Sequence, residues 1–400
     1  MQKHYNNSLL NLIERLKHLS QHPFEEKACL ALQENLIKKI SYIERRIRLC
    51  KRQIKDGKRL LGAKQGIYLG KEAAQNIKGY IEERQIAVLE YQRILFILRH
   101  IGDGIAFTYI NKYEIKPMSY KENPGFISGK VGARAERKFF RSIFKSGNIA
   151  ILNDLTHSLR FGDVTQLSDE GFTLHEVKSS DNSNSRVKRQ ATSLNELVTY
   201  LGTDRIQVEY LGETIEKRRS SLHKDETNHI SQLNRLARHS RNNGDAWEQI
   251  EPGLFFYCSR TDPEDGSYFR LIRKQCSTPP IVAFLNIDKY KSVGYYPLVL
   301  SLEDPVDVLD FFNGELLIFI VVDPSVITQQ FAERNLRVEF SNEDDWETRI
   351  THLSDPTETN SSLSVSSHFW GRIYWEFLGL HYMVSEISHF FYSKVWSEKN

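Results

Sequence analysis

Apolar residues recur every three or four positions along much of the first hundred residues, which is the spacing of amphipathic helices. From Phe24 to Leu61 the apolar positions alternate four and three apart, a heptad seam that requires a partner helix. A second helical pattern runs from about Glu72 to His100. The simplest arrangement is an antiparallel hairpin within the chain, and an intermolecular coiled coil is the alternative. We expect residues 1–110 to form this helical domain.

The pattern changes to one typical of strands beyond residue 150. Two strand-like runs, Leu159 to Leu167 and Phe172 to Val177, flank Ser168-Asp-Glu-Gly171. A Ser at the start and a Gly at the end are typical of a type I turn. A turn centred between positions 169 and 170 pairs Thr165 with Leu174. We therefore predict a β-hairpin over these residues.

The predicted register gathers three charged side chains. Asp163 lies opposite Glu176, and Lys178 shares their face because side chains alternate along a strand, while Val177 points to the other face. Two opposed carboxylates, roughly 5 Å apart at Cβ, repel each other unless a cation lies between them. The pattern therefore indicates a divalent-cation site. A bulge at Gly171 is the alternative, and it would turn Asp163 away.

Glu136 is a further acidic candidate, on a predicted helix from about Lys130 to Lys145. It lies at the edge of the apolar face of that helix, and the positions three and four residues later are Phe139 and Phe140, which offer no ion pair. An inward carboxylate without a local partner is costly. We expect Glu136 to face the same site; a buried glutamate paired elsewhere is the alternative.

A helix is predicted from Arg186 to Leu201, followed by a strand from Asp204 to Leu211. The start of this helix carries several polar residues that can reach a phosphate near the hairpin: Arg186, Lys188, Arg189 and Gln190. A surface helix with basic decoration is the alternative for the three basic residues.

Together these segments resemble the PD-(D/E)XK nuclease superfamily, which has the restriction-endonuclease-like fold, and within it the nuclease-related domain group. The resemblance covers about residues 130 to 210, roughly a quarter of the chain. Gly162, not proline, precedes Asp163 here. The segments that carry the resemblance are Gly132-Ala-Arg-Ala-Glu136, Ile151-Leu-Asn-Asp-Leu155, Gly162-Asp163, Glu176-Val-Lys178 and Arg189-Gln190. The implied fold class is α/β with an αβββαβ core, preceded by the helical hairpin and followed by an α/β extension that ends in a helix.

The resemblance implies Mg²⁺- or Mn²⁺-dependent hydrolysis of nucleic-acid phosphodiesters, with DNA favoured over RNA. Asp163 and Glu176 would ligate the ion together with the carbonyl of Val177. Lys178 would orient or deprotonate the attacking water, and Glu136 would hold a second ion or a metal-bound water.

By the same resemblance, Gln190 positions the phosphate or Lys178. Two other classes of protein remain open. One is a non-catalytic nuclease-like module that binds nucleic acid, and the other is a helical adaptor or effector-sensing protein. A bacterial defence effector or a DNA-processing enzyme is the setting that a nuclease core with extra modules suggests.

The first long helix is strongly basic. Between residues 38 and 59 ten Lys and Arg residues are opposed by two acids, although the net charge of the whole chain is only +3. Such a run is either a solvated face or a surface that tracks nucleic acid, because Lys and Arg contacts to phosphates supply most non-specific affinity. The arginines that we assign to the second interpretation are Arg45, Arg46, Arg48 and Arg52.

The remaining organisation is predicted more coarsely. Residues 111–212 would hold the nuclease core, 213–250 a basic helical connector, 251–350 a small α/β domain or an extension of the nuclease sheet, and 351–400 a Ser/Thr-rich linker with an aromatic C-terminal helix. That helix or the N-terminal helices would mediate contacts with a second copy or a protein partner.

The spacing of the cysteines and the hydropathy of the chain indicate in which cellular compartment the protein resides. The four cysteines stand far apart, which argues against a zinc site or a disulfide framework. The sequence begins with a polar helical pattern and not a signal peptide, and no apolar run approaches the ~20 residues of a membrane span. We expect a cytoplasmic protein without a membrane partner.

Overall fold

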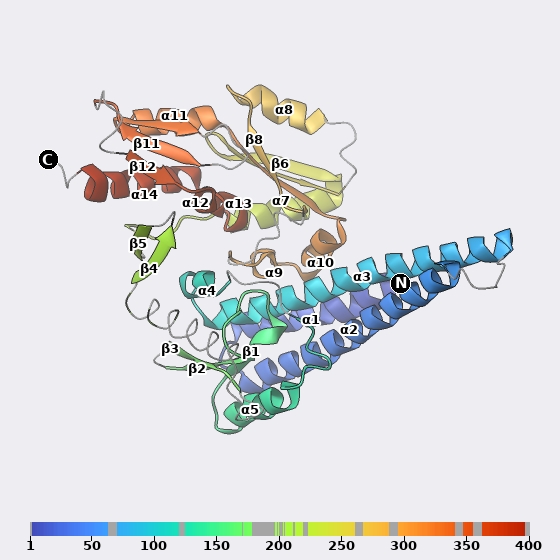
Figure 1. Cartoon of the computed structure of the whole chain (residues 1–400). Coiled ribbons are helices and arrows are strands. Elements are labelled where there is room, and N and C mark those ends of the chain that lie inside the picture. Colours follow the sequence, from blue (N-terminus) through green and yellow to red (C-terminus); the bar gives the residue numbers. More distant parts are fainter. Residues whose placement is uncertain are drawn as a thin grey trace. The chain divides into compact units, whose positions relative to one another are not determined.

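The computed structural model describes residues 2–62, 70–119, 125–169, 171–177, 197, 199, 203, 205–210, 213–218, 223–260, 267–287, 295–340, 347–354 and 362–396. The chain is a mixed α/β protein that divides into two compact units, Met1–Glu216 and Lys217–Asn400. Each unit contains helices and small antiparallel sheets (Figure 1).

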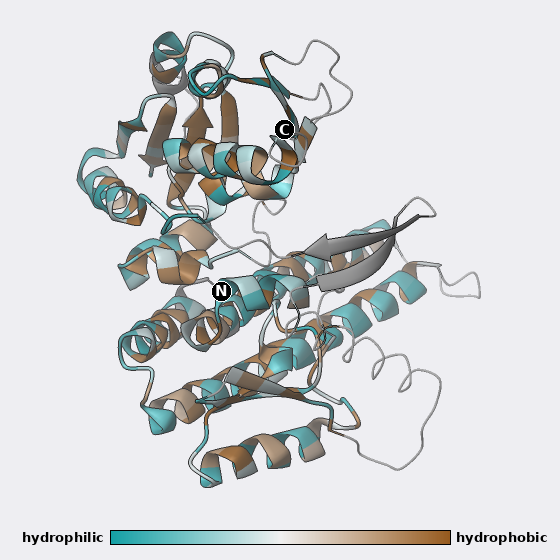
Figure 2. Ribbon diagram, turned by 90° about the vertical axis from the view of Figure 1, so that its left-hand side faces the viewer, coloured by the Kyte–Doolittle hydropathy of each residue, from teal (hydrophilic) through white to brown (hydrophobic). Residues whose placement is uncertain are grey.

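Three helices dominate the first unit: α1 (Gln2–Gln21), α2 (Glu26–Gly62) and α3 (Lys71–Tyr109). Helices α2 and α3 lie side by side (Figure 1) and run antiparallel, since Arg46 contacts Tyr91 while Gly57, nearer the turn, lies against Ile81. The expected pairing of these two helices within the chain is confirmed, and α1 adds a third helix. Both long helices alternate polar and apolar residues along their length (Figure 2). The heptad seam is buried at Leu36, Ile40, Ile43, Ile47 and Cys50.

A three-stranded antiparallel sheet of order β1-β2-β3 follows the bundle. Its strands and neighbouring helices are α4 (Lys112–Met118), α5 (Ala133–Lys145), β1 (Ala150–Leu152), the 3-10 turn η1 (Asn153–Leu155), β2 (Val164–Ser168) and β3 (Gly171–His175). Thr165 pairs with Leu174 and Leu167 with Phe172, so the predicted hairpin register is confirmed, without a bulge at Gly171.

The predicted first strand of the hairpin is too long. Residues 159–163 are not strand, and β2 begins only at Val164. Gly162 has φ +70°, a left-handed conformation that ends extended pairing. The N–H of Asp163 still donates to the carbonyl of His175 at 2.7 Å. Asp163 therefore lies just before β2 rather than within it.

The expected helical connector at 213–250 is wrong at both ends. Residues 213–218 form strand β5 (Glu213–Arg218), which pairs with β4 (Arg205–Tyr210) in a two-stranded sheet. Thr214 and Ile215 are β-branched and favour an extended chain once a partner strand is available. Strand β4 fulfils the expected strand at 204–211, but its partner in the described residues is β5. Most of the predicted helix at 186–201 lies outside the described residues.

The second unit has a four-stranded antiparallel sheet of order β6-β7-β9-β8. Its strands are β6 (Asp245–Glu251), β7 (Leu254–Ser259), β8 (Ile281–Phe284) and β9 (Leu317–Val322). The central strands are largely apolar (Figure 2). Helix α7 (Ile230–Asn243) precedes the sheet and α11 (Pro324–Ala332) follows it. Helix α8 (Ser267–Gln275) lies between β7 and β8, and α9 (Leu298–Ser301) and α10 (Pro305–Asn313) lie between β8 and β9.

The C-terminal region is more structured than a linker and one helix. Strand β12 (Ser362–Val365), expected as linker, pairs with β11 (Thr348–His352), which pairs with β10 (Leu336–Phe340). The expected single aromatic helix is broken into α12 (Ser367–Trp370), α13 (Arg372–Trp375), α14 (Leu380–Phe390) and the π-helical turn η4 (Phe391–Trp396). The break before α14 coincides with Phe377 at φ +54°, a conformation that no helix can continue.

Two further expectations concern cysteines and membranes. All four cysteines are free, and Cys29, Cys50 and Cys258 are buried. Among the described helices, none is both long enough and apolar enough to cross a bilayer.

Candidate functional site

A pocket of about 550 Å³ in the first unit brings together acids from separate parts of the sequence. Four of its lining residues were predicted: Glu136 from α5, Asp163 before β2, and Glu176 and Val177 after β3. Asp154, Lys130 and Arg160 line it as well. The pocket therefore collects four carboxylates and two basic side chains.

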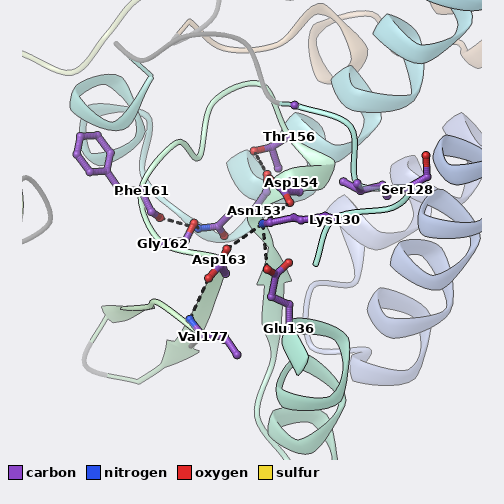
Figure 3. A network of polar contacts seen from close by, with 12 residues as sticks. Ser128, Lys130, Glu136, Asn153, Asp154, Thr156, Phe161, Gly162, Asp163 and Val177 are labelled. Atoms are coloured by element: carbon purple, nitrogen blue, oxygen red, sulfur yellow. Dashed lines mark hydrogen bonds and ion pairs between the residues drawn. The ribbon is translucent and has the colours of Figure 1, made fainter. Parts of the chain in front are cut away.

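The loop before β2 sets the position of Asp163. The side-chain amide of Asn153 donates to the carbonyls of Phe161, at 2.7 Å, and Gly162, at 3.2 Å, and the N–H of Asn153 donates to the carbonyl of Asp163. The Asp163 carboxylate accepts from the N–H of Val177 at 2.9 Å through Oδ2 (Figure 3). One carboxylate oxygen is thus fixed by the chain after β3, and the other, Oδ1, faces the pocket.

Asp154 comes from the 3-10 turn η1, and sequence reasoning gave it no role. The turn is held on the strand side by Gln33 of α2, whose amide donates to the carbonyl of Ala150 at 2.7 Å and accepts from the N–H of Leu152 at 3.0 Å. On the other side it packs on α3 at Gly102. One feature of the sequence could have identified Asp154. It closely follows a buried apolar run, and that segment is one of those that carry the resemblance to the nuclease superfamily.

Glu136 lies in the first turn of α5 and is buried, with only 4% of the residue exposed. Its Oε1 lies 3.0 Å from Nζ of Lys130. A Cβ at Gly132 would approach the same oxygen to 2.7 Å, so the missing side chain at Gly132 leaves room for the carboxylate. Glu136 thus lines the same pocket as Asp163, and its partner comes from outside the helix.

Lys130 joins three of the acids. Its Nζ lies 2.8 Å from Asp154 Oδ2, 3.0 Å from Asp163 Oδ1 and 3.0 Å from Glu136 Oε1 (Figure 3). These three oxygens therefore lie within about 6 Å of one another. Sequence reasoning placed Lys130 only at the start of the helix, because no pattern links it to acids 6, 24 and 33 residues further on.

A buried glutamate of α2 holds the segment that carries Lys130. Glu44 accepts from the N–H groups of Ile127, at 3.0 Å, and Ser128, at 2.7 Å, and pairs with Arg99 of α3 at 3.4 Å. Arg99 in turn donates to the carbonyl of Gly125 at 2.7 Å. Residues 125–128 are therefore fixed to the helical bundle, and Lys130 extends from the end of this anchored segment.

The charges in the pocket influence one another. Burial raises the pKa of the Glu136 carboxyl, and the charge of Asp163 raises it further, whereas Lys130 opposes this shift. Burial alone would lower the pKa of Lys130, but Asp154 and Asp163 together outweigh it, so that the pKa lies above its usual value. The ammonium is thus held in its charged form, and one positive charge is shared among three acids.

The donor set suits a hard divalent cation, although the described residues contain no group of three His, Cys, Asp or Glu side chains arranged to hold one. Carboxylate oxygens are the ligands that Mg²⁺ and Mn²⁺ prefer. Here those of Glu136, Asp154 and Asp163 surround an ammonium instead. The oxygen donors are therefore of the type that Mg²⁺ and Mn²⁺ bind. Their positions, however, fit an ammonium, whose contacts are longer than those of a divalent ion.

Several predicted site residues are outside the described part of the chain: Lys178, Arg186, Lys188, Arg189 and Gln190. The convergence of Lys178 with Asp163 and Glu176 therefore stays a prediction. Glu176 itself is exposed at the pocket rim.

The four arginines of α2 differ in their surroundings. Arg45, Arg48 and Arg52 are exposed, and Arg45 donates to the carbonyl of Ser41 at 3.2 Å. Arg46 is half-buried and donates to Tyr91 Oη at 3.1 Å, and Arg48 donates to Ser128 Oγ at 2.6 Å. Three of the four therefore already have partners within the protein.

No protein-family description, curated protein or solved structure matches this chain.

Proposed function

We propose that the protein is a Mg²⁺- or Mn²⁺-dependent nuclease that hydrolyses phosphodiester bonds, with DNA favoured over RNA, and that its first unit carries a PD-(D/E)XK-like αβββαβ core. The observation that carries the proposal is the convergence of Glu136, Asp154 and Asp163 on one point of a pocket that Glu176 also lines. Four acids against two basic side chains leave an excess of negative charge in the pocket, which a bound cation would offset.

The metal would be held by Asp163 and Asp154, with Glu136 and Glu176 as further oxygen donors. When bound, a divalent ion neutralises charge on the phosphate and lowers the pKa of a coordinated water. Asp163 suits this task because the N–H of Val177 fixes one of its carboxylate oxygens, which orients the other. Preorganised ligands of this kind avoid reorganisation during the reaction.

Basic groups in the pocket suit a phosphate. Arg160 and Lys130 both line it, so a phosphodiester that enters meets positive charge beside the acids. Hydrolysis breaks one P–O ester bond and adds water across it, and the leaving oxygen must receive a proton or a compensating charge. By resemblance, Lys178 would orient or deprotonate the attacking water, and Gln190 would position the phosphate.

Nucleic acid beyond the cleaved bond would contact exposed basic residues of α2, of which Arg45 and Arg52 have side chains open to solvent. Phosphate contacts of this kind give affinity without sequence preference. The setting that we propose is a cytoplasmic bacterial defence effector. A second copy or a protein partner would bind through the N-terminal or C-terminal helices.

A second candidate is a non-catalytic nucleic-acid-binding module. The observation that favours it is the same set of ion pairs, because one lysine shared by three acids is also a way to stabilise a fold without chemistry. In that case the pocket would be a structural network. Removal of any one acid would change the stability of the protein, and neither the variant nor the wild type would cleave nucleic acid.

The test is to incubate the purified full-length protein with plasmid, single-stranded DNA and RNA, in Mg²⁺, in Mn²⁺ and in EDTA. We expect metal-dependent cleavage that is lost in Asp163→Asn and in Glu136→Gln. Equal cleavage by both variants would identify a contaminant. Absence of cleavage, together with binding of the same substrates, would support the second candidate.

A further inference from the structure

The Lys130 ammonium occupies the point on which the carboxylates converge. Its three contacts are 2.8 to 3.0 Å long. Oxygen ligands lie at about 2.0 to 2.6 Å from Mg²⁺ or Ca²⁺, so these oxygens have to move inward only by about 1 Å or less to coordinate an ion. An ammonium and a divalent ion cannot share that point, because their like charges repel and both use the same oxygens.

The charge balance favours exchange. One ammonium contacts three acids, and the pocket as a whole holds four acids, with Glu176 at its rim, against two basic side chains, Lys130 and Arg160. A divalent ion would neutralise more of this charge than the lysine does. The ammonium is also within reach of solvent, since 32% of the Lys130 side chain is exposed.

The chain beside Lys130 allows the side chain to leave without disrupting its anchor. Glu44 fixes the backbone at Ile127 and Ser128, three and two residues before Lys130. The residue after it, Val131, is 93% exposed and so is not part of the core. The four rotatable bonds of lysine can therefore redirect the ammonium while residues 127 and 128 stay on the bundle.

We propose that Lys130 is a displaceable internal cation: it holds the three carboxylates in the metal-free protein, competes with the divalent ion for them, and contacts the substrate phosphate once it has been displaced. This inference rests on the proposed function. It makes metal binding and substrate binding cooperative, because a phosphate that attracts the ammonium vacates the metal position.

The first experiment measures Mn²⁺ binding to the full-length protein by the loss of the free-ion EPR signal. Lys130→Met removes the competitor, and Lys138→Met, an exposed lysine on α5, removes the same charge elsewhere as the matched control. We expect Lys130→Met to bind Mn²⁺ at least about tenfold more tightly than the wild type, and Lys138→Met to bind as the wild type does. Equal or weaker binding by Lys130→Met, with Mn²⁺ bound by the wild type, would overturn the inference alone. Absence of Mn²⁺ binding by every variant would overturn the metal site and the inference together.

Lys130→Met leaves three acids without their cation and will unfold at a lower temperature than the wild type. This loss provides a second readout, because Mn²⁺ should raise the melting temperature of Lys130→Met by more than it raises that of the wild type. An equal or smaller shift in the variant would contradict competition at this point.

The phosphate contact is tested with a short phosphorothioate oligodeoxynucleotide, which resists cleavage. In the wild type the oligonucleotide should tighten Mn²⁺ binding severalfold, and in Lys130→Met it should have a much smaller effect. The same tightening in both proteins would overturn the role of Lys130 as the group that links phosphate to metal.

Discussion

Gly102 of α3 lies directly against the carbonyl group of Leu155: a Cβ at position 102 would lie 2.0 Å from the Leu155 oxygen. The contact is between two backbones, so neither side can move by a rotamer change. It sets the distance between the helical bundle and the turn η1, which carries Asp154.

Gly102→Ala should therefore destabilise the protein by about 3 kcal/mol, because the turn has to move away from the helix. Gly79→Ala, in the same helix and with open space around the Cβ position, is the matched control and should gain about 0.5 to 1 kcal/mol from helix propensity. Urea unfolding followed by circular dichroism measures both. Equal stability of the two variants would mean that η1 is not packed on α3.

Asp154→Asn tests the acid that the sequence did not reveal. If the proposed nuclease site is correct, the loss of one carboxylate charge should lower the rate of DNA cleavage by about a hundredfold or more. Asp169→Asn, in the exposed turn of the hairpin, is the control and should cleave at the wild-type rate. If Asp154→Asn cleaved DNA at the wild-type rate, Asp154 would be excluded from the catalytic site. The role proposed for Asp163 would not be affected.

Glu44→Gln should destabilise the first unit by about 3 kcal/mol, because the buried Arg99 loses the negative charge of Glu44 and one backbone N–H would face an amide N–H. Asp56→Asn in the same helix removes a solvent-exposed pair with Arg59 and should change stability by less than about 0.5 kcal/mol. Hydrogen exchange adds a local readout. Residues 125–130 should exchange faster in Glu44→Gln alone, and unchanged exchange there would contradict the anchoring role.

Gly162→Ala should disturb the site more than Gly147→Ala, which also replaces a glycine in the left-handed conformation. Gly147 and Gly162 have φ of +78° and +70°, so alanine costs about 1 kcal/mol at each. At Gly162 the new Cβ would also lie 2.9 Å from the His175 carbonyl, whereas at Gly147 it meets nothing. We expect Gly162→Ala to lose both stability and Mn²⁺ affinity and Gly147→Ala to lose only stability. Similar Mn²⁺ affinities would show that the loop does not position Asp163.

The pair Asp103 and His157 should make stability depend on pH in two opposing ways. Burial raises the pKa of Asp103 from 3.8 to about 7, so its contribution is present below pH 3.8 and is lost as pH rises toward 7. Burial lowers the pKa of His157 from 6.5 to about 4, so its contribution is present above pH 6.5 and is lost as pH falls toward 4.

Two variants separate these contributions between pH 4 and 7. Relative to the wild type, the unfolding free energy of Asp103→Asn should increase with pH and that of His157→Gln should decrease, each by up to ~1.4 kcal/mol per pH unit. Urea titrations at several pH values measure the slopes. Slopes of the same sign would contradict the assigned protonation of one of the two groups.

Local patterns predicted much of what the first unit contains. The heptad seam indicated α2 and its partner because every seam position from Leu36 to Cys50 had to be covered. The turn residues fixed the register of β2 and β3, since a two-residue connection allows one pairing. The apolar stripe of α5 correctly indicated that Glu136 is buried without a partner in its own helix.

The features that the sequence did not predict depend on contacts between residues far apart in the chain or on the pairing of strands. Lys130 is paired with Asp154 and Asp163 only because η1 and β2 fold back on the segment that Glu44 anchors. Propensity also failed for strands β5 and β12, which were expected as helix and linker but pair with the strands that precede them, β4 and β11. Such pairings are decided by tertiary context rather than by residue preference.

The amide of Gln33 satisfies backbone groups on β1 as a neighbouring strand would. It blocks the outer edge of β1 against recruitment of an additional strand, and so protects that side of the sheet from edge-to-edge aggregation. Within the described residues, any extension of the β1-β2-β3 sheet is left to β3, the strand that leads directly to Glu176. A chain that added itself there would reach the rim of the acidic pocket.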